Sequence, residues 1–163
     1  MKEPGNILMR SLLAFVVITF SSAALHAQKL DEVQVQNLIN SKNFVFKAQT
    51  MLPMTGGSRQ LTSEYDVRVL GDSVVSYLPY FGRAYSVTYG EPGGLDFTST
   101  KFDYEVNHRK KGGWDVTIKL TDTRDVQQLN FTISENGYAT LQVTSNNRQP
   151  ISFNGYIAER KRK

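Results

Sequence analysis

The sequence contains no cysteine. This absence excludes a disulfide framework, a thiolate zinc site, a cysteine nucleophile and a lipid-modified cysteine after a leader. Histidine is scarce too, because only His108 lies outside the first 27 residues. A histidine-rich metal site or a Ser-His-Asp triad would have to depend on that one residue. We therefore predict no metal site and no cofactor, and we assign no catalytic residue.

The length and the composition are those of one folded domain. The chain has 163 residues, of which 40% are hydrophobic, 21% charged and 11% aromatic. A single domain usually has ~100 to 200 residues, and a chain this rich in apolar residues buries a core instead of remaining disordered. A second large domain is excluded.

Residues 1–27 have the three parts of a secretory signal peptide. Lys2 and Arg10 supply positive charge, residues 11–25 are uncharged and mostly apolar, and Ala27 is a small residue after which a peptidase would cut. Cleavage after Ala24 is the alternative. The apolar run is shorter than the ~20 residues that span a bilayer, and no later run is long enough. We expect an exported protein, periplasmic or secreted, with no transmembrane span in the mature chain.

Positive charge is in slight excess, with a net charge of +4 and a pI near 9.3. Without the signal peptide and the four cations at 160–163, the count of Lys and Arg falls from 19 to 13 and that of Asp and Glu from 15 to 14. The body of the domain is therefore nearly neutral. We interpret residues 158–163 as a solvated basic tail, with contact to lipid head groups or an acidic polymer as the alternative. A nucleic-acid partner is not expected.

One helix is predicted at the start of the mature chain, over residues 28–42. Acidic residues at 31 and 32 would occupy its first turn, where the helix dipole favours negative charge. Four residues recur at helical spacing: Leu30, Val33, Asn37 and Leu38. We expect this helix to pack on the rest of the domain.

Strands are predicted throughout residues 43–157. Apolar and polar residues alternate in eight segments, 44–50, 65–70, 73–78, 101–107, 114–120, 129–133, 138–143 and 151–157. Gly71-Asp72 and Asn136-Gly137 predict hairpin turns, and residues 51–58 predict a loop. The predicted class is mainly β, with an antiparallel sheet of about eight or nine strands and one short N-terminal helix. A meander, a sandwich and a partly open barrel all fit this pattern.

Two segments carry a resemblance to a known family. GDSVVSYLPYFGRAY at 71–85 and RQPISFNG at 148–155 resemble the family catalogued as domain of unknown function 4251. The resemblance extends over about residues 43–157. It implies an exported bacterial protein with a signal peptide and one domain. The family has no established activity, so the resemblance implies no catalytic residue.

The best candidate binding patch is a cluster of aromatic residues between positions 77 and 89. Tyrosine rings on a segment broken by proline and glycine present flat apolar faces with polar tips, which suits stacking on sugars or peptides. An arginine beside them would pair with a carboxylate or phosphate. A purely structural role for the aromatic rings, with the arginine held by Asp72 or Asp96, is the alternative. The candidate ligand-binding residues are Tyr77, Tyr80, Phe81, Arg83, Tyr85 and Tyr89.

Other reactive residue types give weaker signals. Asp103 and Glu105 are two apart on one predicted strand, so we expect them on its solvent face. The segment 122–125 contains two aspartates but lacks the density of a calcium loop, so we interpret it as a turn. His108 precedes two basic residues and is expected to be exposed.

These observations favour a non-catalytic role. The expected function is that of a binding or envelope-associated module that uses the aromatic and arginine patch, with an envelope glycan, a peptide or a protein as its partner. A carboxylate-dependent hydrolase acting on envelope or extracellular polymers is the first alternative, and it requires two acids that converge in a cleft. A carrier that holds an apolar ligand between helix and sheet is the second, and it requires a deep apolar cavity.

Overall fold

The computed structural model of the protein describes residues 30–85 and 93–160. Within these ranges one helix precedes nine strands. Their bounds are α2 (Glu32–Asn40), β1 (Asn43–Pro53), β2 (Arg59–Leu70), β3 (Val74–Leu78), β4 (Leu95–Ser99), β5 (Phe102–His108), β6 (Trp114–Leu120), β7 (Val126–Ile133), β8 (Tyr138–Ser145) and β9 (Ile151–Ala158).

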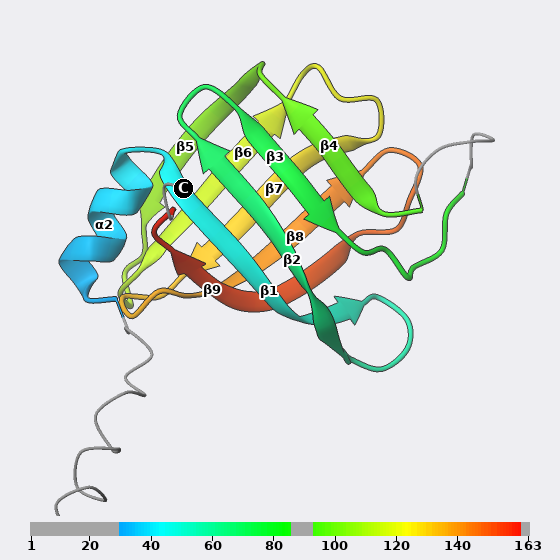
Figure 1. Ribbon diagram of the computed structural model, residues 1–163, viewed down its shortest axis with the longest axis horizontal. Coiled ribbons are helices and arrows are strands. Elements are labelled where there is room, and N and C mark those ends of the chain that lie inside the picture. The colour runs from blue at the N-terminus through cyan, green and yellow to red at the C-terminus, as the bar shows by residue number, and fades with distance from the viewer. Residues whose placement is uncertain (1–29, 86–92, 161–163) are drawn as a thin grey trace, which may run out of the picture.

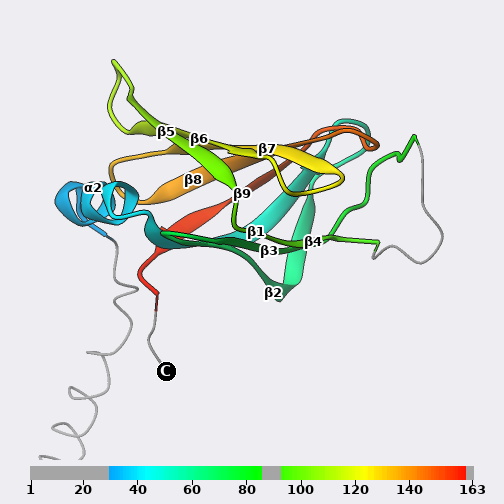
Figure 2. The same cartoon turned by 90° about the horizontal axis from the view of Figure 1, so that it is seen from above.

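All nine strands belong to one sheet, in the order β4-β3-β2-β1-β9-β8-β7-β6-β5, and every pair of neighbours is antiparallel. The sheet curves round so that β1 to β4 form one layer and β5 to β8 lie over them (Figures 1 and 2). Its two edge strands, β4 and β5, follow each other in the chain. The predicted mainly β class is confirmed, and the architecture is a nearly closed, flattened barrel.

The interior between the two layers is filled by large apolar side chains. Phe131 contacts the rings of Phe44 and Phe46 edge to face, with centroids 5.8 and 5.7 Å apart, an arrangement that aromatic pairs favour. All three rings are buried, as are Met51 and Phe153. The alternation of apolar and polar residues along the strands therefore produces one contiguous core, because the apolar face of each strand is turned inward.

Helix α2 covers one end of the barrel. A capping box starts the helix: the Asp31 side chain accepts from the N–H of Gln34 at 2.7 Å, and the Gln34 side chain accepts from the N–H of Asp31 at 3.0 Å. Val35 and Ile39, four residues apart, are fully buried against the sheet. The hydroxyl of Tyr104 on β5 donates to the carbonyl of Ile39 at 2.9 Å, and burial raises the pKa of this phenol.

The four residues that recur at helical spacing do not share one buried face of the helix. Val33 is 64% exposed and Asn37 is also exposed, while Leu30 and Leu38 are half-buried against the core. Asp31 is the N-cap and not a residue of the first turn, so the helix begins at Glu32. The side chains that face the sheet therefore follow the spacing of Val35 and Ile39.

The predicted hairpins are present. The turn at Gly71, where φ is +83°, joins β2 to β3, and the turn at Gly137 joins β7 to β8. Strand β1 extends through Pro53 into the predicted loop because that residue lies opposite Ile151 on β9. Strand β4 is short and lies outside the eight predicted segments. It raises the number of strands from the eight predicted segments to nine.

The contact between β1 and β9 contains a bulge. Ala48 lies opposite Gly155 and Thr50 opposite Asn154, so Gln49 is the extra residue on β1. The backbones come so close here that a Cβ on Gly155 would lie 1.9 Å from the carbonyl oxygen of Lys47. Only glycine fits this position.

We expect Gly155→Ala to lower the free energy of unfolding by about 2 kcal/mol or more, because the added methyl group must displace backbone. Urea unfolding followed by circular dichroism measures this change. Gly57→Ala is the matched control, since a Cβ on Gly57 would have no neighbouring atom within 4 Å. Equal midpoints for the two variants would contradict the close contact between β1 and β9.

Candidate functional site

Asp122, in the loop between β6 and β7, holds the turn between the two edge strands. Its carboxylate accepts hydrogen bonds from the hydroxyl of Ser99 and from the backbone N–H groups of Thr100 and Lys101, the latter two at 2.8 and 3.1 Å. These donors, the Ser99 hydroxyl first, lower the pKa of Asp122 to about 2. The β6–β7 loop is therefore fixed to the point where the chain passes from β4 to β5.

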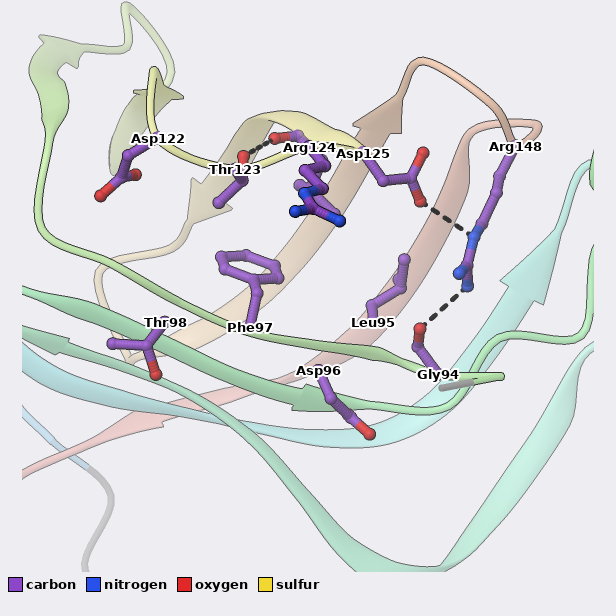
Figure 3. Close-up of a pocket in the computed structure, with 11 residues that line it drawn as sticks. Gly94, Leu95, Asp96, Phe97, Thr98, Asp122, Thr123, Arg124, Asp125 and Arg148 are labelled. Carbon is purple, nitrogen blue, oxygen red and sulfur yellow. Dashed lines mark hydrogen bonds and ion pairs between the residues drawn. The ribbon is translucent and has the colours of Figure 1, made fainter. Parts of the chain in front are cut away.

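Arg148 and Asp125 join the β8–β9 loop to the β6–β7 loop. Arg148 Nε lies 2.9 Å from Asp125 Oδ2, and Arg148 Nη1 donates to the carbonyl of Gly94 at 2.9 Å (Figure 3). The two charged side chains are only 12% and 17% exposed. The other oxygen of Asp125 accepts from the N–H of Asn147 at 3.1 Å. Both charges are thus paired and hydrogen-bonded, which a largely buried ion pair requires.

These two anchors border a cleft of about 270 Å³ between β4 and the β6–β7 loop. Leu95, Phe97 and Val126 supply apolar surface. Arg124 extends from the loop and Phe97 from β4 into the same space (Figure 3). Arg124 is exposed, and within residues 30–85 and 93–160 its guanidinium has no hydrogen-bond or ion-pair partner. The cleft therefore combines an apolar wall with an arginine that has no partner in this part of the chain.

Five of the six residues of the predicted aromatic patch lie in the described ranges, and they have different contacts. Tyr80 is half-buried, and its hydroxyl shares one proton between the carbonyl oxygens of Arg83 and Gln149, at 2.8 and 3.1 Å. Its ring lies 5.2 Å from the guanidinium carbon of Arg148, a cation–π contact, and burial is the main cause that raises the pKa of its hydroxyl. The ring of Tyr80 therefore packs against Arg148, which lines the cleft together with Arg124.

Ring contacts are present for two more of the predicted residues. Phe81 is 57% exposed and lies 5.2 Å from Arg59, whereas Tyr77 lies on β3 with its ring 5.4 Å from that of Tyr65. Arg83 and Tyr85 are exposed, and the Arg83 side chain makes no ion pair with Asp72 or Asp96. Tyr89 lies outside the described residues.

Sequence reasoning missed the residues that shape the cleft. The sequence pattern indicates only a turn for Asp122, Arg124 and Asp125, and only a second turn and the family resemblance for Arg148. Asp122 contacts residues 21 to 23 positions away, and Asp125 pairs with a residue of another loop. The sequence signal for these residues is the pair of aspartates that flank Thr123 and Arg124. This pattern does not predict which residues the aspartates contact.

The remaining acid and histidine predictions concern exposed residues. Asp103 and Glu105 are exposed on the solvent face of β5, as expected. His108 is exposed, and its ring lies edge to face with that of Trp114, with the two ring centroids 5.9 Å apart. In the described ranges no group of three or more His, Asp or Glu side chains could hold a metal ion. No helix in those ranges has both the length and the apolar character to cross a membrane.

The fold and the site define a class: a nearly closed antiparallel β domain with a helix over one end and, at the other, a small cleft with an apolar wall and an arginine. The chain belongs to the family described as domain of unknown function DUF4251, whose profile matches residues 26–157. A similar solved structure is the crystal structure of a DUF4251 family protein from Bacteroides eggerthii. That protein is 17% identical, with a TM-score of 0.59, and the alignment covers 78% of this chain and 87% of the other. No curated protein matches the chain.

Asp122→Asn should remove a pH-dependent part of the stability. The pKa of Asp122 is lowered from 3.8 to about 2 on folding, so its contribution is present above pH 3.8 and is lost as the pH falls through 2. We expect the wild type to be more stable than Asp122→Asn at pH 6, with the difference shrinking toward pH 2. Urea unfolding of both proteins across this range measures the difference.

Asp103→Asn is the control for that experiment, because Asp103 is an exposed acid on the neighbouring strand β5. A difference between wild type and Asp122→Asn that stays constant from pH 6 to pH 2 would contradict the assigned role of the Asp122 carboxylate.

Proposed function

We propose that the protein is an exported, non-catalytic binding protein that holds a small organic anion with an apolar group in the cleft beside Arg124. The observation that carries this proposal is the guanidinium of Arg124, which lacks a partner in the described part of the chain and faces apolar surface. Arginine binds carboxylates through two parallel hydrogen bonds. We therefore assign a carboxylate to the proposed ligand.

Two of the other charged side chains of the cleft, Asp122 and Asp125, are held by contacts within the protein. Asp125 pairs with Arg148, and Asp122 accepts hydrogen bonds from the β4–β5 turn. Asp96 is exposed at the edge. Arg124 is therefore the charge that a ligand would engage, while Leu95, Phe97 and Val126 would contact its apolar part.

The size of the cleft limits the ligand. Its volume of about 270 Å³ is just below the ~300 to 1,000 Å³ typical of sites for drug-sized molecules. We therefore expect it to hold one group of about the size of an aromatic amino acid, either free or at the end of a peptide.

A hydrolytic role receives no support from the two anchored acids. A general acid must carry a proton near neutral pH, whereas the lowered pKa of Asp122 keeps that group ionised. Asp125 is occupied by Arg148. A carrier role would need a deep apolar cavity between helix and sheet, where Val35 and Ile39 of α2 are fully buried in the core. Binding without chemistry is the function that these contacts favour.

The binding proposal predicts that N-acetyl-phenylalanine stabilises the purified protein and that its uncharged amide does not. At a hundred times its Kd, a ligand adds about 2.7 kcal/mol to the free energy of unfolding. Thermal unfolding with each compound measures this gain. Arg124→Gln should abolish the gain for the acid, because it removes the positive charge and keeps a side chain of similar length.

Arg83→Gln is the matched control, since Arg83 is an exposed arginine that does not line the cleft. If Arg83→Gln lost binding and Arg124→Gln kept it, the result would contradict binding in the cleft and would favour a binding site at the aromatic segment. Equal binding of the acid and the amide would contradict the role of the carboxylate.

The proposed export predicts a processed N-terminus. When the full-length chain is expressed in a bacterium with a periplasm, we expect the protein in the periplasmic fraction to begin at Gln28, or at Leu25 if cleavage follows Ala24. Intact-mass spectrometry of that fraction distinguishes the two. An unprocessed chain confined to the cytoplasm would contradict the proposal.

A further inference from the structure

The outward face of β7, β8 and β9 carries a continuous polar surface. The strand register places Thr132 opposite Thr140, and Thr140 opposite Asn154. The Thr140 hydroxyl donates to Asn154 Oδ1 at 3.0 Å, and the Thr132 hydroxyl donates to Asp115 Oδ1 at 3.0 Å. Hydroxyl and amide groups are thus aligned across three strands, with acceptors and donors held in fixed positions.

A hollow of about 380 Å³ lies on this surface. Ala139 and Gly155 contribute to it, and the bulge in β1 adds Gln49. The side chains that matter for recognition are Gln49, Arg109, Thr132, Tyr138, Thr140 and Asn154. The hollow is separate from the cleft at Arg124, since the two share no lining residue.

Tyr138 gives the hollow an exposed aromatic ring. Its side chain is 59% exposed, and it lies opposite Tyr156, which is 39% exposed. A tyrosine offers a flat apolar face and a polar tip. Most of the other side chains in the hollow are hydroxyls and amides. A sugar ring has the matching chemistry, with an apolar C–H face and hydroxyl groups at its rim, whereas a lipid or an apolar peptide does not.

Among the described residues that line the hollow, Arg109 is the charged one. No carboxylate lines it, and the next two residues of the exposed β5–β6 hairpin are Lys110 and Lys111. Arg109 Nε lies 3.6 Å from Asp115 Oδ2, and these side chains are 42% and 50% exposed. An ion pair this exposed contributes little free energy, so a ligand carboxylate can replace it.

We propose that this hollow binds an acidic saccharide, with the ring of Tyr138 against a sugar face and Arg109 paired with a uronic acid carboxylate. Thr140 and Asn154 exchange hydrogen bonds with the sugar hydroxyls. The site is independent of the ligand proposed for the cleft, and the two are tested by different variants.

Trigalacturonic acid is the probe, and the neutral trimer of galactose is its uncharged counterpart. NMR titration of the purified protein at low ionic strength should shift the backbone signals of Tyr138, Thr140 and Asn154 with the acid. Arg109→Gln should weaken binding of the acid by about fivefold, the upper range for an exposed ion pair. Added salt should weaken it too.

Lys119→Gln is the matched control, because Lys119 is an exposed cation on β6 that does not line the hollow. It removes the same charge and should leave the affinity nearly unchanged. Tyr138→Ala should weaken binding and Tyr138→Phe should retain it, since the ring supplies the contact. Arg124→Gln should have no effect, which separates this site from the cleft.

Three results would overturn the proposal. The first is the absence of shifts at Tyr138, Thr140 and Asn154 with trigalacturonic acid. The second is an equal loss of affinity in Arg109→Gln and Lys119→Gln, which would indicate only a general charge effect. The third is equal affinity for the neutral trimer, which would remove the role of the carboxylate.

Discussion

The sheet ends where two strands that follow each other in the chain do not pair, and the Asp122 carboxylate holds that point together. Strand β4 pairs with β3, and β5 pairs with β6. A barrel closed all the way round would join its edges by backbone hydrogen bonds. In place of that ladder, one side chain from the β6–β7 loop accepts hydrogen bonds from Ser99, Thr100 and Lys101. Because these donors favour the ionised form, the pKa of Asp122 is low, and the contact persists wherever the carboxylate is charged.

The cleft depends on the same loop. Asp122 fixes the loop to the β4–β5 turn, and Asp125 fixes it to Arg148, so that Arg124 between them faces β4 from a restrained backbone. The ring of Tyr80 makes a cation–π contact with Arg148. A ligand that binds Arg124 would therefore meet a largely formed site, which lowers the conformational entropy lost on binding. The hollow on the outer face has another origin, because it is built from the regular register of β7 to β9 and the bulge in β1.

Local features of the fold were predictable and long-range features were not. Gly71-Asp72 and Asn136-Gly137 specify hairpins because their backbone preferences act between adjacent strands. No comparable signal marks the pairing of β1 with β9, which brings Lys47 opposite Tyr156. The same limit applies to the site. The aromatic segment that starts at Tyr77 is visible as a cluster in the sequence. The hydrogen bond from Tyr80 to the Gln149 carbonyl is not, because it depends on the tertiary contact between two loops that are far apart in the chain. Arg124 was identifiable only once the partners of its neighbours were known.

Native-state hydrogen exchange at the seam between β4 and β5 tests this account most directly. The amides of Thr100 and Lys101 belong to no strand and donate to Asp122. If the carboxylate holds the edges of the barrel together, these two amides exchange at neutral pH as slowly as those inside β4, since both open only when the seam opens. Exchange at the rate of an unstructured loop, with protection confined to the strands, would contradict the role assigned to Asp122.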